Sequence, residues 1–136
     1  MPKSRLTLVF DEHFSHKQVG FVADESRGTH AARLIHVRQR GWSGKPDLEW
    51  MPQAIGEGFV IVTADRNERT REITVDGFLG MGARVFLLGS FWDHRRRWDQ
   101  AKWLVARLDG LIETAMSMNS GNVLIIGADG QVRPAE

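Results

Sequence analysis

Short apolar runs alternate with amphipathic stretches along the whole chain, which predicts strands alternating with helices. Strands are expected at residues 5–10, 32–37, 59–66, 83–90 and 122–127. Helices are expected within residues 16–28, 47–58, 67–82 and 98–118, with Ser15 and Asp47 able to cap the first two. The last nine residues, 128–136, are interpreted as a frayed tail.

The helix expected at residues 98–118 has the clearest pattern, because apolar residues recur there at three- and four-residue steps and form one stripe. The stripe consists of Ala101, Leu104, Val105, Leu108, Leu111, Ile112 and Ala115. Fourfold alternation of strand and helix implies parallel strands joined by right-handed crossovers. The strands are uniformly apolar, which is typical of a sheet covered on both faces. The fold class is therefore α/β, a three-layer α/β/α sandwich with a central, mainly parallel five-stranded sheet.

Composition narrows the class of protein. A chain of 136 residues fits a single domain spanning 1–136, and 42% hydrophobic residues can form a core. The net charge of +1 means that binding to a polyanion would need a local basic patch. The absence of cysteine excludes disulfides, thiolate nucleophiles and sulfur-ligated zinc. No apolar run approaches the ~18 residues of a membrane span, and residues 1–10 lack a signal-peptide pattern, so a cytoplasmic location without membrane association is expected.

Acidic side chains follow three of the expected strands. Asp11 and Glu12 come directly after the first strand, Asp65 lies at the end of the third, and Asp93 lies three residues past the fourth. Because ligands bind beyond the carboxyl ends of parallel strands, these acids are expected to converge on one crevice. Their mutual repulsion would be relieved by a cation, and oxygen ligands favour Mg²⁺ or Mn²⁺. Such an ion could activate water and bind a phosphate oxygen, as in phosphodiester hydrolysis.

Plainer explanations exist for each acid taken alone. Asp47 and Glu49 open a helix, and Asp47 would reach the crevice only if the preceding loop folds back. An Asp after a strand also caps a helix or starts a turn, which would account for Asp65 in "TADRN". Glu12 could point away from the crevice, because adjacent residues diverge.

Arginines are concentrated beside the candidate acids. The segment "FWDHRRRW" contains Arg95, Arg96 and Arg97 among aromatic residues, a combination that suits the phosphates and bases of single-stranded nucleic acid. The alternative is a solvated helix start. His13 could meet the same substrate or remain a surface residue, and His36, in an apolar strand, is interpreted as a hydrogen-bonded core residue.

Three segments carry a family resemblance: "LVFDEHFS", "PDLEW" and "FVIVTADRN". With their order and spacing, the chain over about residues 5–125 resembles the PIN-like domains of the DUF5615/VapC45-like group. The resemblance implies an acidic Mg²⁺/Mn²⁺ site, ribonuclease activity and a role as the toxin of a type II toxin–antitoxin pair. It also implies an antitoxin protein as partner and a homodimer, for which the aromatic segment 91–103 is the candidate surface.

Carried over by position, Asp11, Asp47 and Asp65 match the three metal-binding acids of the group. Asp93 is the positional candidate for a fourth catalytic acid, although "SFWDH" does not match a family motif. The chain departs from the group in having His13 where Asn is usual. Glu49 also competes with Asp47 for the second position.

Three functions are compatible with these patterns. The leading hypothesis is a metal-dependent ribonuclease that uses Asp11, Asp47, Asp65 and Asp93. A catalytically inactive module of the same fold, which binds RNA or protein, is the alternative. A phosphoacceptor receiver domain would share the strand pattern, but it needs a lysine after the fifth strand, where this chain reads Gly-Ala-Asp (127–129).

Overall fold

The structure is a computed structural model that describes residues 6–27, 32–64 and 75–135. Its strands are β1 (Thr7–Phe10), β2 (Arg33–His36), β3 (Val60–Thr63), β4 (Arg84–Leu88), β5 (Val123–Ile126) and β6 (Val132–Pro134). Its α-helices are α1 (His16–Glu25), α2 (Asp47–Gly56), α3 (Val75–Gly80) and α4 (Arg97–Met116). Two short 3₁₀ helices, η1 (Val37–Arg40) and η2 (Ser90–His94), follow β2 and β4. Ser15 caps α1 as expected, its hydroxyl accepting the amide of Gln18 at 3.4 Å.

The strands form one sheet in the order β2-β1-β3-β4-β5-β6, in which the first five are parallel. From β1 the chain moves to one side to form β2 and then returns to the other side to form β3. The strand order therefore reverses between β1 and β3, and such a switch point opens a crevice beyond the carboxyl ends of the two strands.

The sheet has a sixth strand that the sequence interpretation missed, so the expectation of a frayed tail after residue 127 is wrong. β6 pairs antiparallel with β5, with Ile126 opposite Val132. A tight turn makes this hairpin possible: Gly130 has a φ of 81°, and the Asp129 carboxylate accepts the amide of Gln131 at 3.0 Å. Glycine suits that turn because it adopts positive φ without steric cost.

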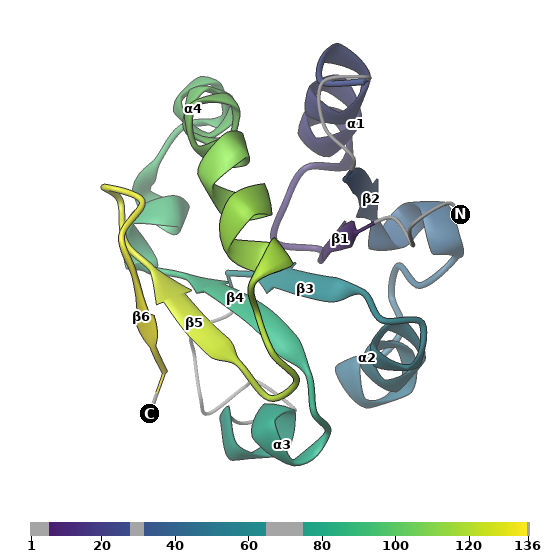
Figure 1. Cartoon of the computed structure of the whole chain (residues 1–136). Helices are drawn as coiled ribbons and strands as arrows, with labels where there is room; N and C mark the ends of the chain where they lie inside the picture. The colour runs from purple at the N-terminus through teal and green to yellow at the C-terminus, as the bar shows by residue number, and fades with distance from the viewer. Residues whose placement is uncertain (1–5, 28–31, 65–74, 136) are drawn as a thin grey trace, which may run out of the picture.

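Helices cover both faces of the sheet, as the three-layer expectation requires (Figure 1). Side chains alternate along each strand, so Leu8 and Phe10 pack in the core beneath α1 and α4, while Val9 packs in the core beneath α2 and α3. The same alternation in β3 places Ile61 with Val9. The chain thus builds two apolar cores on a shared sheet.

The apolar stripe expected for α4 is confirmed at its buried members Leu104, Leu108, Leu111, Ile112 and Ala115 but is wrong at one edge. Val105 is 57% exposed, whereas Trp103, which the stripe omitted, is 4% exposed and packs in the core. Leu104 and Leu108 are buried as expected. A tryptophan fills more of the core than a valine, so the helix turns the larger apolar side chain inward.

The different burial of Leu108 and Val105 predicts unequal effects for two substitutions in α4. Leu108→Ala should lower the free energy of unfolding by about 2–5 kcal/mol, because it opens a cavity in the core. Val105→Ala should change it by less than about 0.5 kcal/mol, because the side chain is exposed. Urea unfolding of the two variants measures both values, and equal losses would contradict the observed orientation of α4.

Candidate functional site

The register between β1 and β3 places Asp11 beside Thr63. Phe10 lies opposite Val62 in the parallel pair, and the amide of Asp11 continues the ladder by donating to the Val62 carbonyl at 3.2 Å. One residue further, the hydroxyl of Thr63 donates a hydrogen bond to Oδ2 of Asp11. The two side chains therefore meet at the switch point of the sheet, the position where α/β proteins of this topology bind ligands.

Asp11 is a buried carboxylate held by several donors. It is 6% exposed, its Oδ1 accepts the amide of His13 at 3.0 Å, and its Oδ2 lies 3.2 Å from Nδ1 of the same histidine. Within the described ranges, Asp11 forms no ion pair with a lysine or arginine, and His13 is its one titratable partner. A carboxylate removed from water without a fixed positive charge beside it attracts a cation.

The second candidate acid, Asp47, begins α2. It is the first helical residue rather than the cap, because Pro46 occupies the cap position. Asp47 is half-buried, and its Oδ1 accepts the indole N–H of Trp50 at 3.2 Å. Glu49, its competitor, lies on the surface and pairs with Lys45 at 3.5 Å. Of the two, Asp47 is the acid with the more enclosed setting.

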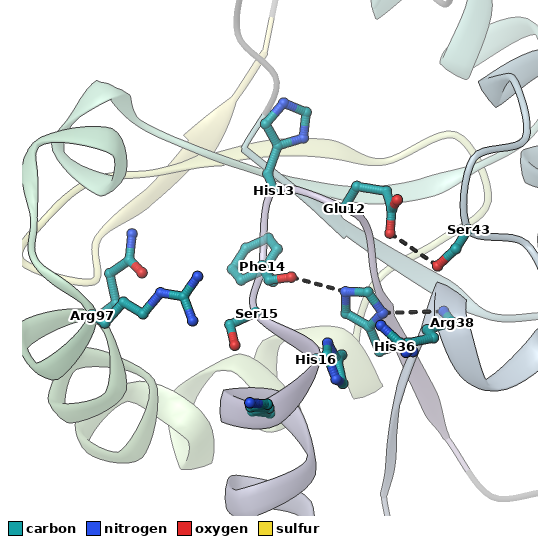
Figure 2. Close-up of a pocket in the computed structure, with 11 residues that line it drawn as sticks. Glu12, His13, Phe14, Ser15, His16, His36, Arg38, Ser43 and Arg97 are labelled. Carbon is teal, nitrogen blue, oxygen red and sulfur yellow. Dashed lines mark hydrogen bonds between the residues drawn. The ribbon is translucent and has the colours of Figure 1, made fainter.

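Glu12 points toward the loop that precedes α2. Its Oε1 accepts the hydroxyl of Ser43 at 3.1 Å, so this loop lies against the end of β1 (Figure 2). Trp42, in the same loop, is a packed anchor: it is 4% exposed and stacks on Trp50 with ring centroids 5.6 Å apart.

The remaining two candidate acids differ in what the structure says of them. Asp65 lies outside the described residues. Asp93 is exposed in η2, and its buried neighbour Trp92 donates from Nε1 to the carbonyl of His13 at 3.3 Å. η2 therefore lies against the segment that follows β1. Among residues 6–27, 32–64 and 75–135, no three acidic or histidine side chains come close enough to form a metal site.

A pocket of about 550 Å³ opens next to Asp11, lined by Glu12 and His13 on that side. We call it the basic pocket, because Lys17 of α1, Arg38 of η1 and Arg97 of α4 also line it. In Figure 2 the side chain of Arg97 extends from α4 toward the start of α1, and Arg38 lies on the opposite side. Its three cations thus come from three separate elements.

His36 holds two walls of the basic pocket together. It is 4% exposed, its Nε2 lies 2.8 Å from the carbonyl of Phe14, and its Nδ1 accepts the amide of Arg38 at 3.1 Å (Figure 2). A carbonyl can only accept, so these bonds fix the tautomer with the proton on Nε2. The interpretation of His36 as a hydrogen-bonded core residue is confirmed.

The three consecutive arginines have different surroundings. The guanidinium of Arg95 lies over the ring of Phe91 at 5.3 Å, and Arg96 is almost fully exposed beside Asp99. Arg97 alone of the three lines the basic pocket, and its carbonyl accepts the side-chain amide of Gln18 at 2.9 Å, which fixes α4 to α1.

Desolvation and nearby positive groups both act on His16, which lines the basic pocket. Loss of surrounding water, and after it the charge of Arg38, lowers the pKa of His16 from its ordinary value. His36, Lys17 and Arg97 add smaller effects in the same direction. Positive groups on α1, η1 and α4 therefore all lower the pKa of the same histidine.

Sequence patterns left two groups of residues unassigned. Thr63 belongs to the quoted "FVIVTADRN" segment, but its role as a donor to Asp11 depends on the register of β1 against β3. Lys17 and Arg38 stand alone among polar neighbours in the sequence, and the topology brings them together. One sequence feature could have indicated the role of Thr63, because it is a polar residue at the end of an otherwise apolar strand.

The fold and the site define a doubly wound α/β protein with a buried carboxylate at its switch point. A family model described as a PIN like domain matches residues 7–90. This match spans β1 to the start of η2, so the chain belongs to the PIN-like domain family. Searches of curated proteins and of solved structures gave no significant match. No helix in the described part of the chain is long and apolar enough to cross a membrane.

The hydrogen bond from Thr63 to Asp11 predicts different outcomes for two substitutions. Thr63→Val keeps the shape but leaves the buried Asp11 carboxylate without this donor, and a hydrogen bond to a charged group contributes about 1.5–3 kcal/mol. Thr63→Ser retains the hydroxyl and should lose less stability. Chemical unfolding compares the two variants, and a Ser variant as unstable as the Val variant would contradict the role of the hydroxyl.

The field on His16 predicts a measurable titration. Its pKa, followed by NMR of the imidazole protons, should lie below the ordinary value of a histidine, and Arg38→Gln should raise it by removing the nearby charge with the largest effect. Arg33→Gln, at the opposite end of β2, is the matched control and should leave the pKa unchanged. An equal rise of the His16 pKa in both variants would contradict a specific effect of the Arg38 charge.

Proposed function

We propose that this PIN-like protein is a Mg²⁺- or Mn²⁺-dependent ribonuclease of the DUF5615/VapC45-like group, acting in the cytoplasm as the toxin of a type II toxin–antitoxin pair. The observation that carries the proposal is the buried Asp11 carboxylate at the switch point, which has no lysine or arginine partner among the described residues. Desolvated negative charge of this kind is stabilised by a bound cation.

The chemistry of the donors fits a hard divalent ion. Asp11 and Asp47 offer carboxylate oxygens, and Asp65 is proposed as the third ligand on the family pattern. Asp11 has hydrogen bonds at both oxygens, so its orientation is fixed before a ligand arrives. A bound Mg²⁺ or Mn²⁺ would supply an activated water and charge neutralisation at a phosphate.

The other side chains have roles in orientation and binding in this proposal. Thr63 and His13 hold the Asp11 carboxylate in one rotamer. Asp93, exposed on η2, is proposed to orient water, because Trp92 anchors this helix against the segment after β1. Arg97 reaches the substrate strand from α4.

Protein partners are the second part of the proposal. Of the aromatic residues in segment 91–103, Trp92 and Trp103 are buried and Phe91 is half-buried, so only Trp98, 72% exposed, offers its ring to a partner. We therefore narrow the proposed dimer or antitoxin surface to the start of α4 around Trp98. An exposed tryptophan is a frequent anchor of protein interfaces.

An inactive module that binds RNA or protein is the alternative function. Two observations favour it: three donors already occupy the Asp11 carboxylate, and the indole of Trp50 occupies Oδ1 of Asp47. Carboxylates engaged in this way have fewer lone pairs left for a metal.

Titration of Mn²⁺ tests the proposed function. Calorimetry should show binding to the wild type and none to Asp11→Asn, and Mn²⁺ should raise the stability of the wild type by about 2.7 kcal/mol at a hundredfold excess over Kd. Asp24→Asn, a surface substitution on α1, should bind Mn²⁺ normally. Single-stranded RNA should be cleaved by the wild type and by Asp24→Asn but not by Asp11→Asn. Folded wild type that neither binds Mn²⁺ nor cleaves RNA would favour the inactive module.

A further inference from the structure

The basic pocket carries charge that the rest of the protein leaves uncompensated. Lys17, Arg38 and Arg97 line it, and none of them forms an ion pair with a residue in the described part of the chain. The one acid in its lining, Glu12, has its Oε1 bonded to Ser43. Three cations against one acid leave the pocket with an excess of positive charge, although the whole chain has a net charge of only +1.

The cations converge because hydrogen bonds between elements fix the backbone that presents them. The Nδ1 of His36 accepts the amide of Arg38 at the start of η1, and the Gln18 side chain donates to the carbonyl of Arg97 at the start of α4. Lys17 lies in the first turn of α1, which Ser15 caps. Like charges repel, so holding three of them around one concave space lowers stability unless an anion enters.

We propose that the basic pocket binds a backbone phosphate of single-stranded RNA, next to the reacting phosphate that the proposed function assigns to Asp11. The pocket borders the acidic end of β1 directly, because His13 lines it while its Nδ1 lies 3.2 Å from Oδ2 of Asp11. An RNA strand that crosses Asp11 therefore places a neighbouring phosphate among Lys17, Arg38 and Arg97. This inference names a substrate subsite and rests on the proposed function.

A phosphate fits this lining better than a carboxylate of a protein partner. Two guanidinium groups on opposite walls suit a tetrahedral anion with several acceptor oxygens, each arginine bonding a different pair. The hydroxyls of Ser15 and Ser43 also line the pocket. The volume of about 550 Å³ exceeds what one carboxylate would fill and accommodates a phosphate with its sugar.

The pocket also explains how binding and cleavage are separated in space. Cations placed directly at Asp11 would pair with the carboxylate and compete with a metal ion. In the pocket around the start of α1, the three cations can bind the RNA strand without pairing with the Asp11 carboxylate. The substrate is then oriented by the pocket and the reacting phosphate by the acidic end of β1.

The test measures RNA binding without cleavage. A fluorescein-labelled oligouridylate of about ten nucleotides is titrated, in EDTA, into the Asp11→Asn protein and into the same protein carrying Arg38→Gln and Arg97→Gln. The double pocket substitution should weaken binding by about tenfold or more, since hydrogen bonds to charged groups are lost. The slope of log K against log salt should fall by about 0.7 for each phosphate contact removed.

The matched control carries Arg33→Gln and Arg107→Gln, which remove the same charge outside the pocket from exposed arginines of β2 and α4. It should keep its affinity within about twofold, since distant charges act only through a screened field. Inorganic phosphate should also shift the NMR signals of His16 in the pocket-intact protein but not in the Arg38→Gln/Arg97→Gln protein.

Several outcomes would overturn the proposal. Equal weakening by the pocket pair and the control pair would show that RNA responds to overall charge alone. A polyglutamate peptide that competes at lower concentration than the oligouridylate would assign the pocket to an acidic protein segment. Failure of the proposed function gives a different result. If the wild type does not cleave RNA with Mn²⁺ but the Arg38→Gln/Arg97→Gln substitutions still weaken RNA binding, the protein is a binding module and the pocket proposal stands.

Discussion

The hydrogen bond between Thr63 and Asp11 is the contact on which the candidate site depends. It exists because β1 and β3 pair in a fixed register, so residues 52 positions apart in the chain face each other at the carboxyl edge of the sheet. A slip of one residue would turn Asp11 to the opposite face and disrupt both apolar cores. The packing of Val9 and Ile61 therefore sets the position of the acid as firmly as any polar contact.

The site divides its charges between two adjacent regions. Asp11 is buried and forms no ion pair with an arginine in the described part of the chain, whereas Lys17, Arg38 and Arg97 line a pocket that water can enter. Two hydrogen-bonded joints hold the walls of the pocket together: His36 connects the segment before α1 to η1, and Gln18 connects α1 to α4. Because both joints involve α1, movement of that helix would alter the pocket on two sides while leaving the β1–β3 register intact.

Much of the fold was predictable because it depends on local patterns. The apolar runs located β1 to β5, and the three-layer arrangement followed from uniformly apolar strands. β6 was missed because its three residues are exposed and their pattern is weak, so the hairpin turn at Gly130 defines it more than hydrophobicity does. The stripe of α4 was wrong at one edge, because it omitted the large apolar Trp103 and counted Val105, which faces solvent.

Of the site, the sequence predicted individual acids but not their surroundings. Asp11 could be placed from the end of one apolar run, whereas its contact with Thr63 needs the order of strands, and the strand order needs the whole chain. The order 2-1-3-4-5 occurs in unrelated families, so topology locates a ligand crevice without naming the ligand.

What separates this protein from a phosphoacceptor with the same order is Gly127 after β5, where no lysine is present to hold a phosphoryl group. In this chain three cations from α1, η1 and α4 line a pocket next to the end of β1 instead, and this is the surface that we propose for a phosphate of an extended strand.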